Sequence, residues 1–479
     1  MIDLSTLEPV ATVDERFQSY NVEMVEVTGG RFWAPYENRN GERYRMRPPM
    51  DLSSQRLRNL AKQLGPAFVR VSGTWANSTY LQAEGEQIDA PPSGFEQLLT
   101  RDQWRGLVDF VESVDGAIVT SFPISAGARD EAGVWQTEQA QRILDLTRES
   151  GGTIAAAEFA NEPNATALGR FPAGYSAQDY GRDFRIFRDW ARANAPEMKI
   201  LGPGSVGEGA IFGSIPVAAQ AGFIRSQDML RENAGNVDVF SYHFYGAVSE
   251  RCAGLGVDVA EFDAALSAPW LERSNSDLAF YSELRDRFEP GKPIWLTETA
   301  QAACGGSPWA ASFADSFRYV DQLGQHASGG VEVVMHNTLA ASDYALIDED
   351  TLEPRPTYWA ALLWKRVMGE TVLSQPATPS RDLRIYAHCL PFREGGVGLA
   401  ILNLGRDAHQ LPLGSAASVF SLTAAELDSR TVMVNGAIPA MDDAGKITGL
   451  VPVETPNLAI APQSITFVSV PAARNASCS

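Results

Sequence analysis

Eight short apolar runs alternate with longer amphipathic stretches along the first two-thirds of the chain, and this alternation limits the fold more than any other feature. Several runs are continuously apolar, as expected for strands of a parallel sheet covered on both faces. The predicted strands are Val22–Val27, Ala67–Ser72, Ala117–Ser125, Thr153–Glu162, Lys199–Ser205, Val237–Gly246, Pro293–Ala300 and Val331–Thr338. Eight strand-then-helix units of this length predict a (β/α)₈ TIM barrel.

Helices are predicted between these strands, and the texture of the sequence changes after the last one. The helices are Gln55–Leu64, Arg105–Val114, Glu138–Ser150, Tyr180–Asn194, Val259–Leu266, Pro308–Leu323 and Thr357–Met368. After Gly369 the segments are short, β-rich and separated by Gly, Asn, Pro and Asp, which is typical of an antiparallel β-sandwich. We therefore expect an α/β protein with a catalytic barrel at residues 15–368, a C-terminal sandwich at 369–479, and an N-terminal segment, 1–14, that joins the sandwich.

The composition excludes several classes of function. Lys and Arg total 39 and Asp and Glu total 59, so the formal charge is −20 and the surface repels nucleic acid and anionic lipid. No apolar run approaches the roughly 18–20 residues of a membrane-spanning helix. The chain has five histidines and no HExxH pattern, so neither a metal nor another cofactor is expected. No basic and apolar leader follows Met1, so a signal peptide is not apparent.

Two glutamates stand at the ends of predicted barrel strands, where active sites of this fold lie. Glu162 ends the fourth strand in the sequence Ala160-Asn161-Glu162-Pro163, and Glu298 ends the seventh in Leu296-Thr297-Glu298-Thr299. A single glutamate is most often a solvated surface charge. A carboxylate at each of two buried strand ends instead fits the acid and the nucleophile of a retaining glycosidase, which stand about 5–5.5 Å apart.

Further polar residues near these strand ends are candidates for supporting roles. His243 and Tyr245 lie on one side of the sixth strand, and Tyr245 is placed to donate to Glu298. A buried core histidine is the alternative for His243. Asn161 precedes the acid and is a candidate for the sugar 2-hydroxyl. Arg70 is a charge inside an apolar strand and needs a buried partner, for which we predict Glu298.

Long collinear segments resemble glycoside hydrolase family 79 of clan A, the heparanase-like β-glucuronidases. The segment KPIWLTETAQAACGGSPWAASFADSFRYVDQLG is similar to the family's nucleophile strand, glycine turn and following helix. The segment VEVVMHNTLAASDYALIDEDTLEPRPTYWAALLWKRVMGETVL is similar to its eighth strand and linker helix. The resemblance runs through most of the chain and indicates a single-chain bacterial or fungal relative.

The resemblance implies β-glucuronidase activity with retention of configuration, exo or endo. It makes Glu162 the acid/base and Glu298 the nucleophile. Asn161, His243 and Tyr245 also match site positions of the family. The substrate-binding positions that it adds are Glu23, Thr74, Gly305, Gly306 and Tyr344. The N–H groups of the two glycines are expected to hold the glucuronate carboxylate, as an anion nest without a basic residue, and Tyr344 completes that pocket. An ordinary loop is the alternative for the glycines.

The four cysteines fit the same resemblance. LRIYAHC and the terminal NASCS look like the paired cysteines of the family's sandwich, which implies a Cys389–Cys478 disulfide. Cys252 and Cys304 follow neighbouring strands, so a second disulfide beside the active site is expected. Two disulfides imply a secreted, periplasmic or extracellular protein. The alternative is four free thiols in a cytosolic enzyme.

The leading hypothesis is a monomeric, retaining β-glucuronidase that acts on glucuronate-containing oligosaccharides or polysaccharides. One alternative is a clan A glycosidase for a neutral sugar, of the xylosidase or arabinofuranosidase type. Another is a non-catalytic glycan-binding relative, although such proteins usually lack one carboxylate and both are present here. The charge of −20 argues against heavily sulfated heparan sulfate as the best substrate.

Overall fold

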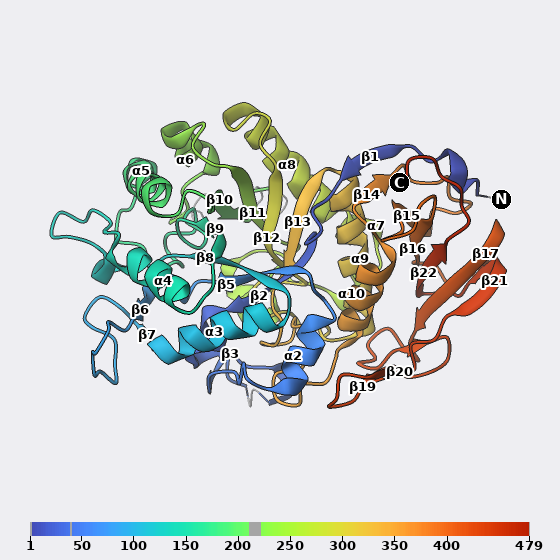
Figure 1. Cartoon of the computed structure of the whole chain (residues 1–479), viewed down its shortest axis with the longest axis horizontal. Helices are drawn as coiled ribbons and strands as arrows, with labels where there is room; N and C mark the ends of the chain where they lie inside the picture. Colours follow the sequence, from blue (N-terminus) through green and yellow to red (C-terminus); the bar gives the residue numbers. More distant parts are fainter. Residues whose placement is uncertain (1, 39–40, 210–221, 479) are drawn as a thin grey trace.

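A computed structural model describes residues 2–38, 41–209 and 222–478 (Figure 1). Eight parallel strands form a closed barrel in the order β10-β11-β12-β13-β2-β5-β8-β9, which confirms the predicted (β/α)₈ fold. The barrel strands are β2 (Gln18–Glu23), β5 (Ala67–Ser72), β8 (Gly116–Ser121), β9 (Ile154–Glu158), β10 (Lys199–Val206), β11 (Val239–Tyr245), β12 (Ile294–Ala300) and β13 (Val331–His336). Small sheets outside the barrel pair β3 (Gly30–Trp33) with β4 (Tyr44–Arg47), and β6 (Thr79–Leu81) with β7 (Gln97–Leu99).

Helices α2, α3 and α5 begin at side chains that cap the free N–H groups of their first turn. Thr100 and Ser176 form capping boxes with Gln103 and Asp179, and Ser54 caps a third helix. The helices are α1 (Met24–Thr28), α2 (Gln55–Lys62), α3 (Arg101–Ser113), α4 (Glu138–Glu149), α5 (Ala177–Asn194), α6 (Ser226–Asn233), α7 (Ala268–Leu271), α8 (Arg273–Phe288), α9 (Phe313–Ser328) and α10 (Pro356–Val367). None of the helices in the described ranges is both long and apolar enough to cross a bilayer.

Several predicted bounds differ from the structure: the fourth strand, for example, ends at Glu158 and not at Glu162. The first barrel strand ends at Glu23 rather than Val27, because the chain turns there into α1, where the Glu23 N–H donates to the Glu26 carboxylate at 2.6 Å. The helix predicted at Val259–Leu266 is wrong, since only one turn forms there, at Phe262–Ala264. The helix that precedes the seventh strand is α8. Its sequence is largely polar, so its buried face cannot be recognised from an apolar pattern.

The C-terminal region forms an antiparallel sheet that includes a strand from the N-terminus. Its order is β1-β14-β15-β16-β22-β17-β18, and β21 also pairs with β17. The strands are β1 (Pro9–Thr12), β14 (Thr371–Leu373), β15 (Leu383–Cys389), β16 (Val397–Asn403), β17 (His409–Thr423), β18 (Met433–Val434), β21 (Val453–Ile460) and β22 (Ser464–Val470), beside a small hairpin of β19 (Ala440–Met441) and β20 (Ile447–Thr448). The antiparallel β-rich domain predicted from the sequence is confirmed.

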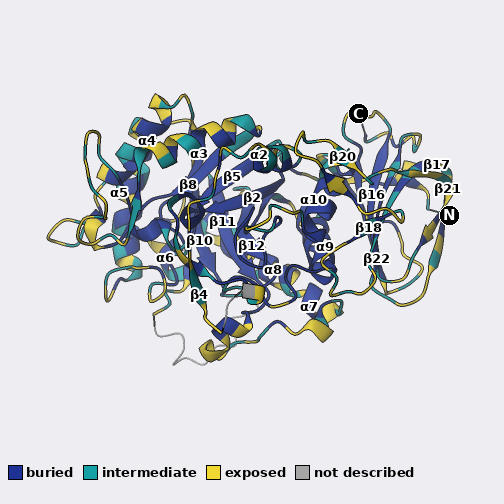
Figure 2. Cartoon of the chain, turned by 90° about the horizontal axis from the view of Figure 1, so that it is seen from below, coloured by how far each residue is buried: buried dark blue, intermediate teal, exposed yellow. Residues whose placement is uncertain are grey.

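Helices α9 and α10 lie between the barrel and this sheet, and Figure 2 shows both as buried ribbon. Side chains alternate along β15: Ile385 and Ala387 face a core within the C-terminal region, while Tyr386 packs toward the barrel. The Tyr386 ring leaves no room for a side chain at Gly324 of α9, where a Cβ would lie 2.2 Å from the ring. The Tyr386 hydroxyl donates to buried Asp321 at 2.7 Å. The sheet therefore covers one flank of the barrel.

Candidate active site

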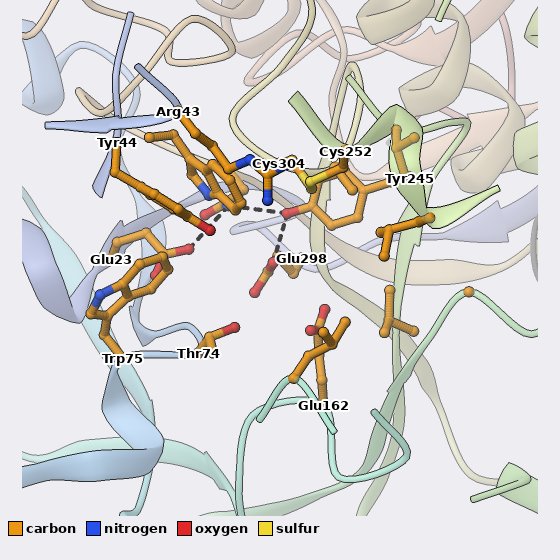
Figure 3. Close-up of a pocket in the computed structure, with 18 of the residues that line it drawn as sticks. Glu23, Arg43, Tyr44, Thr74, Trp75, Glu162, Tyr245, Cys252, Glu298 and Cys304 are labelled. Atoms are coloured by element: carbon orange, nitrogen blue, oxygen red, sulfur yellow. Dashed lines mark hydrogen bonds between the residues drawn. A yellow bond between two sulfur atoms is a disulfide. The ribbon is translucent and has the colours of Figure 1, made fainter. Parts of the chain in front are cut away.

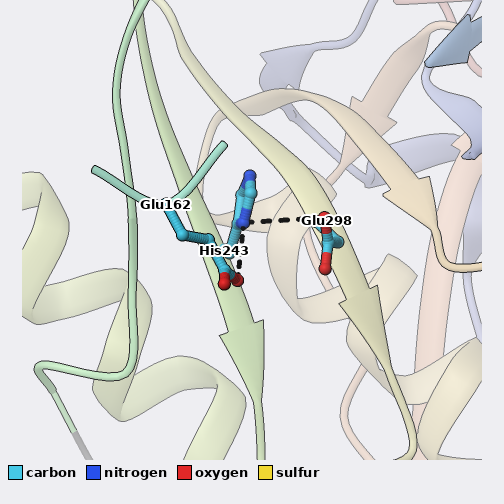
Figure 4. Close-up of side chains that lie close together, drawn as sticks. All are labelled: Glu162, His243 and Glu298. Carbon is cyan, nitrogen blue, oxygen red and sulfur yellow. Dashed lines mark hydrogen bonds and ion pairs between the residues drawn. The ribbon is translucent and has the colours of Figure 1, made fainter. Parts of the chain in front are cut away.

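Two glutamates approach each other at the carboxyl end of the barrel. Glu298 lies on β12, and its side chain is 7% exposed. Glu162 follows β9, and its φ of 49° puts it in the left-handed region, which residues other than glycine seldom adopt. A carboxylate oxygen of each and a ring nitrogen of His243 lie within 4.8 Å of one another (Figure 4). The fold thus brings the two predicted catalytic carboxylates into one site.

His243, on β11, contacts both glutamates. The pairing of β11 with β12 slips by one residue after Tyr242, and this slip sets His243 beside Glu298. His243 Nδ1 lies 3.1 Å from Glu162 Oε1 and 3.7 Å from Glu298 Oε2. Burial alone would lower the pKa of His243, but the Glu298 carboxylate, with those of Glu158 and Glu162, raises it to about 9. The raised pKa favours the protonated imidazole at neutral pH, with Nε2 lying 3.2 Å from Arg70 Nη2.

A buried ion pair supports Glu298 from within the barrel. Arg70, on β5, donates to Glu298 Oε2 at 2.8 Å, the contact expected from the sequence. It also donates to Glu158 Oε2, at 2.8 Å from Nη2 and 3.1 Å from Nε. The hydroxyls of Ser241 and Thr297 donate to the other Glu158 oxygen at 2.9 and 2.7 Å. Burial would raise the pKa of Glu158, but Arg70 holds it well below its usual value, so this carboxylate stays ionised.

Glu158 is a residue that the sequence analysis missed. It ends β9, four residues before Glu162, in the run AAAEFANEP. A charge inside an apolar strand was the signal that singled out Arg70, and Glu158 carries the same signal. Pairing these two buried charges would have predicted their contact. Asn161 joins the same network, because its Oδ1 accepts from Arg70 Nη2 at 2.9 Å.

A second polar cluster lies around the other oxygen of Glu298. Tyr245 Oη donates to Glu298 Oε1 at 2.6 Å. The side-chain nitrogen of Asn337 lies 3.0 Å from Tyr245 Oη and 3.2 Å from both Tyr344 Oη and Glu23 Oε1. The sequence analysis did not single out Asn337, although it directly follows β13, at the end of the barrel where site residues gather.

Glu23 packs so closely against position 73 that only glycine fits there. A Cβ on Gly73 would lie 1.6 Å from Glu23 Oε2, and the φ of Gly73 is 91°. Burial, reinforced by the Glu298 carboxylate, raises the pKa of Glu23 well above its usual value. Glu23 is therefore expected to carry a proton and to offer both a donor and an acceptor.

The charges at the centre of the site balance. Burial raises the pKa of Glu162, and Glu298 raises it further, against the lowering effect of His243. The raised pKa values favour the neutral forms of Glu162 and Glu23. Two cations, Arg70 and His243, face the two remaining carboxylates. A protonated Glu162 beside a charged Glu298 is the state in which one group can donate a proton and the other can attack.

These residues border a cavity of about 750 Å³ (Figure 3). Of the predicted site residues, those lining the cavity are Glu23, Thr74, Glu162, Tyr245, Glu298 and Tyr344. Arg70, Asn161 and His243 are buried outside this lining and act on it through their hydrogen bonds.

The predicted glycine turn lies next to the cavity. Gly305 and Gly306 have φ values of 82° and 80°, but Cys304, rather than either glycine, lines the cavity. The Gly306 N–H already donates to the Ala302 carbonyl at 3.2 Å, which leaves Gly305 as the candidate amide. Buried Arg251 anchors the turn by donating to the carbonyls of Cys304 and Gly306 at 3.1 and 2.6 Å.

All four cysteines are paired, which confirms both expected disulfides. Cys252–Cys304 joins the loops after β11 and β12, and both residues line the cavity. Cys389–Cys478 ties the end of β15 to the C-terminus. The first disulfide therefore fixes the glycine turn to the loop opposite, and the second stabilises the C-terminal sheet.

Comparison with known proteins assigns the chain to a family. The model of "Glycosyl hydrolase family 79, N-terminal domain" matches residues 49–324, which is more than half of the chain. The chain belongs to glycoside hydrolase family 79. The match includes β9 and β12, so both glutamates of the site fall within this glycosidase domain.

Relatives of this family 79 glycosidase extend over most of its length. Heparanase of Mus musculus is 26% identical over 508 residues, covering 94% of this chain and 88% of the relative. Baicalin-beta-D-glucuronidase of Scutellaria baicalensis is 25% identical over 464 residues, covering 88% and 84%. The structure of 4-O-alpha-L-rhamnosyl-beta-D-glucuronidase from Fusarium oxysporum 12S has a TM-score of 0.66 and 14% identity, covering 96% of this chain and 97% of the other. The similarity to this Fusarium structure is one of fold alone.

Proposed function

We propose that this glycosidase hydrolyses β-linked glucuronic acid with retention of configuration, with Glu298 as nucleophile and Glu162 as acid and base. The observation that carries the proposal is the short separation of the carboxylates, whose nearest oxygens lie within 4.8 Å. Retaining pairs stand about 5–5.5 Å apart, whereas inverting pairs stand about 6.5–9.5 Å apart to admit a water molecule.

The reaction proceeds in two displacements. Glu298 attacks the anomeric carbon and forms a glycosyl ester, while Glu162 gives its proton to the departing glycosidic oxygen. The raised pKa of Glu162 suits a group that must arrive protonated. Glu162, now a carboxylate, then takes a proton from water, whose oxygen displaces Glu298 from the anomeric carbon. Glucuronic acid leaves, and both glutamates return to their starting state.

Three residues position these glutamates. Arg70 and Tyr245 bond opposite oxygens of Glu298, which fixes its carboxylate and stabilises its negative charge. His243 holds Glu162 through Nδ1 and leaves the second Glu162 oxygen for the substrate. For the sugar hydroxyls we propose contacts with Glu23 and Thr74. Asn161, beside the acid, is proposed to meet the 2-hydroxyl.

The carboxylate of glucuronate needs a partner of opposite charge or a set of donors. Arg43 lines the cavity from the loop between β3 and β4, and Figure 3 shows its guanidinium pointing between Tyr44 and Cys304 toward the centre. Among the described residues, no carboxylate forms an ion pair with this guanidinium. We propose that Arg43 binds the sugar carboxylate together with the Gly305 N–H and the Tyr344 hydroxyl. The family and its named glucuronidase relative support the same sugar.

The test is the hydrolysis of p-nitrophenyl glycosides that differ only in the sugar. We expect release of p-nitrophenol from the β-D-glucuronide and little from the β-D-glucoside, the β-D-xyloside or the α-L-arabinofuranoside. Proton NMR early in the reaction should show the β-anomer of glucuronic acid appearing first, before mutarotation. Preference for a neutral sugar would replace the proposed substrate, and initial release of the α-anomer would replace the proposed mechanism.

The two disulfides bear on where the enzyme works. Structural disulfides form and persist in oxidising surroundings, such as the periplasm and the extracellular space. We therefore propose a secreted or periplasmic enzyme. Fractionation of cells that express the full-length gene, followed by a β-glucuronidase assay of each fraction, tests this location.

A further inference from the structure

The two halves of the cavity differ in chemistry. The barrel order places β13, β2 and β5 side by side, and their loops bring charged and hydrogen-bonding side chains, such as Asn337, Glu23 and Arg43. Strands β9, β10 and β11 are also consecutive and form the opposite part of the ring. The lining residues from this second half are mainly aliphatic or aromatic. The apolar side chains that give this half, the apolar half, its character are Leu168, Val206, Phe223, Val248 and Leu255.

Two leucines of the apolar half are exposed to solvent. Leu168, in the loop after β9, is 46% exposed, and Leu255, in the loop after β11, is 40% exposed. Single exposed leucines are ordinary on protein surfaces. Two of them from separate loops that line one cavity, together with the Glu162 carboxyl group, are instead typical of a ligand site.

The proposed mechanism determines which part of the substrate contacts the apolar half of the cavity. Glu162 donates its proton to the oxygen that leaves with the aglycone, so the aglycone must lie on the side of Glu162. Leu168 belongs to the same loop as Glu162, six residues further along. The glucuronate ring then occupies the polar half, and the leaving group faces the leucines.

We propose that the apolar half binds a hydrophobic aglycone, so that the substrates are β-glucuronides of phenols or apolar alcohols rather than glycan chains. This inference rests on the proposed β-glucuronidase function and adds the class of leaving group. Among the described lining residues, a sugar unit at the same place would meet few hydrogen-bonding groups, and its hydroxyls would lose water without replacement there.

The charges of the residues that line this half also favour a hydrophobic aglycone over a second acidic sugar. Among the described residues that line this half, the cation is Arg170, and its Nε bonds Glu96 at 2.7 Å. A second acidic sugar would therefore find no unpaired cation there. The cavity volume of about 750 Å³ lies within the range of pockets that enclose one drug-sized ligand. That volume suits a glucuronic acid with a single aglycone.

The experiment compares ethyl β-D-glucuronide with 2-cyclohexylethyl β-D-glucuronide. The two alcohols are similarly acidic, so the ratio of their kcat/KM values reports binding of the aglycone rather than leaving-group chemistry. We expect the larger glucuronide to be favoured about tenfold or more. The kcat/KM value for the 2-cyclohexylethyl glucuronide should also exceed that for a glucuronosyl-N-acetylglucosamine disaccharide. In the double variant Leu168→Asn, Leu255→Asn, the preference should fall to about threefold or less.

Ile438→Asn provides the matched control, because Ile438 is 63% exposed in the C-terminal region, outside the cavity lining. It should retain the wild-type ratio. Equal kcat/KM values for the two alkyl glucuronides in the wild type, preference for the disaccharide, or an unchanged ratio in the double variant would overturn the apolar subsite and leave the proposed β-glucuronidase in place. Failure of the wild type to hydrolyse any β-glucuronide would overturn the proposed function itself.

Discussion

His243 should carry a proton at pH values where an ordinary histidine has lost it. Its imidazole is enclosed by Glu162, Glu298 and Glu158, which raise its pKa from 6.5 to about 9 against the cost of burial. Because the pKa is higher in the folded than in the unfolded chain, the protonated imidazole stabilises the fold. This contribution is fully present below about pH 6.5 and disappears as the pH rises through about 9.

The size of the effect follows from the two pKa values. A difference of about 2.5 between 6.5 and 9, at about 1.4 kcal/mol for each unit, gives about 3 kcal/mol of folding free energy. In wild-type protein, urea titrations between pH 6 and pH 10 should therefore show about 3 kcal/mol more loss of stability than in His243→Gln. His409→Gln, which removes a histidine of the C-terminal sheet, is the control and should behave as wild type.

NMR of protein with isotope-labelled histidine observes the proton directly. The chain has five histidines, and burial lowers the pKa values of His326, His336 and His388 to about 4, 3 and 4, so these should not titrate above neutral pH. The signal absent from His243→Gln identifies His243 and should titrate near pH 9 in the wild type. A midpoint at or below 6.5, or the same pH dependence of stability in the variant and the wild type, would refute this account of the site.

Four further variants test the remaining assignments. Glu298→Ala should lower kcat for p-nitrophenyl β-glucuronide by at least about 10⁴-fold with an unchanged circular dichroism spectrum, and residual turnover near wild type would show that another group is the nucleophile. Glu162→Ala should slow hydrolysis of an alkyl glucuronide far more than that of an aryl glucuronide, because a good leaving group needs little protonation; equal losses would remove Glu162 from the acid role. Arg43→Gln should raise KM for the glucuronide about tenfold but leave KM for the neutral glucuronamide within about twofold, and equal effects on both would deny it the sugar carboxylate. Replacing Cys252 and Cys304 by alanine should cost up to about 4 kcal/mol of stability, from the 52-residue separation, and raise KM; an unchanged denaturation midpoint would contradict this.

The parts of the site that the sequence predicts are those held by regular structure. Glu162 directly follows the fourth barrel strand and Glu298 lies near the end of the seventh, and a closed parallel barrel must bring these strand ends together. Tyr245 and His243 are predictable for the same reason, because alternation along β11 places them on one side. The apolar run that contains Glu23 is informative only in part, since buried α1 continues it beyond the end of the strand.

The parts that the sequence does not predict depend on loops and on pairing between distant charges. Arg43 reaches the cavity through a hairpin, and the path of a hairpin is not fixed by barrel periodicity. Helix α8 was missed because Ser274 and Asp277 are among its buried residues, so no apolar stripe marks it. Glu158 was missed because it lies just before a more conspicuous motif, although its contact with Arg70 is as short as that of Glu298.

The buried ion pair of Arg70 and Glu158 explains how the two catalytic glutamates, a few ångströms apart, take different roles. Both oxygens of Glu298 accept hydrogen bonds, one from Arg70 and one from Tyr245, which fix the position of the attacking carboxylate. Among the described residues, His243 is the side chain that bonds Glu162, and burial raises the pKa of Glu162, which favours its neutral form. Arg70 and a protonated imidazole would repel each other without a compensating charge, and Glu158 supplies it. The division of labour between nucleophile and acid is thus set by a third glutamate that never reaches the sugar.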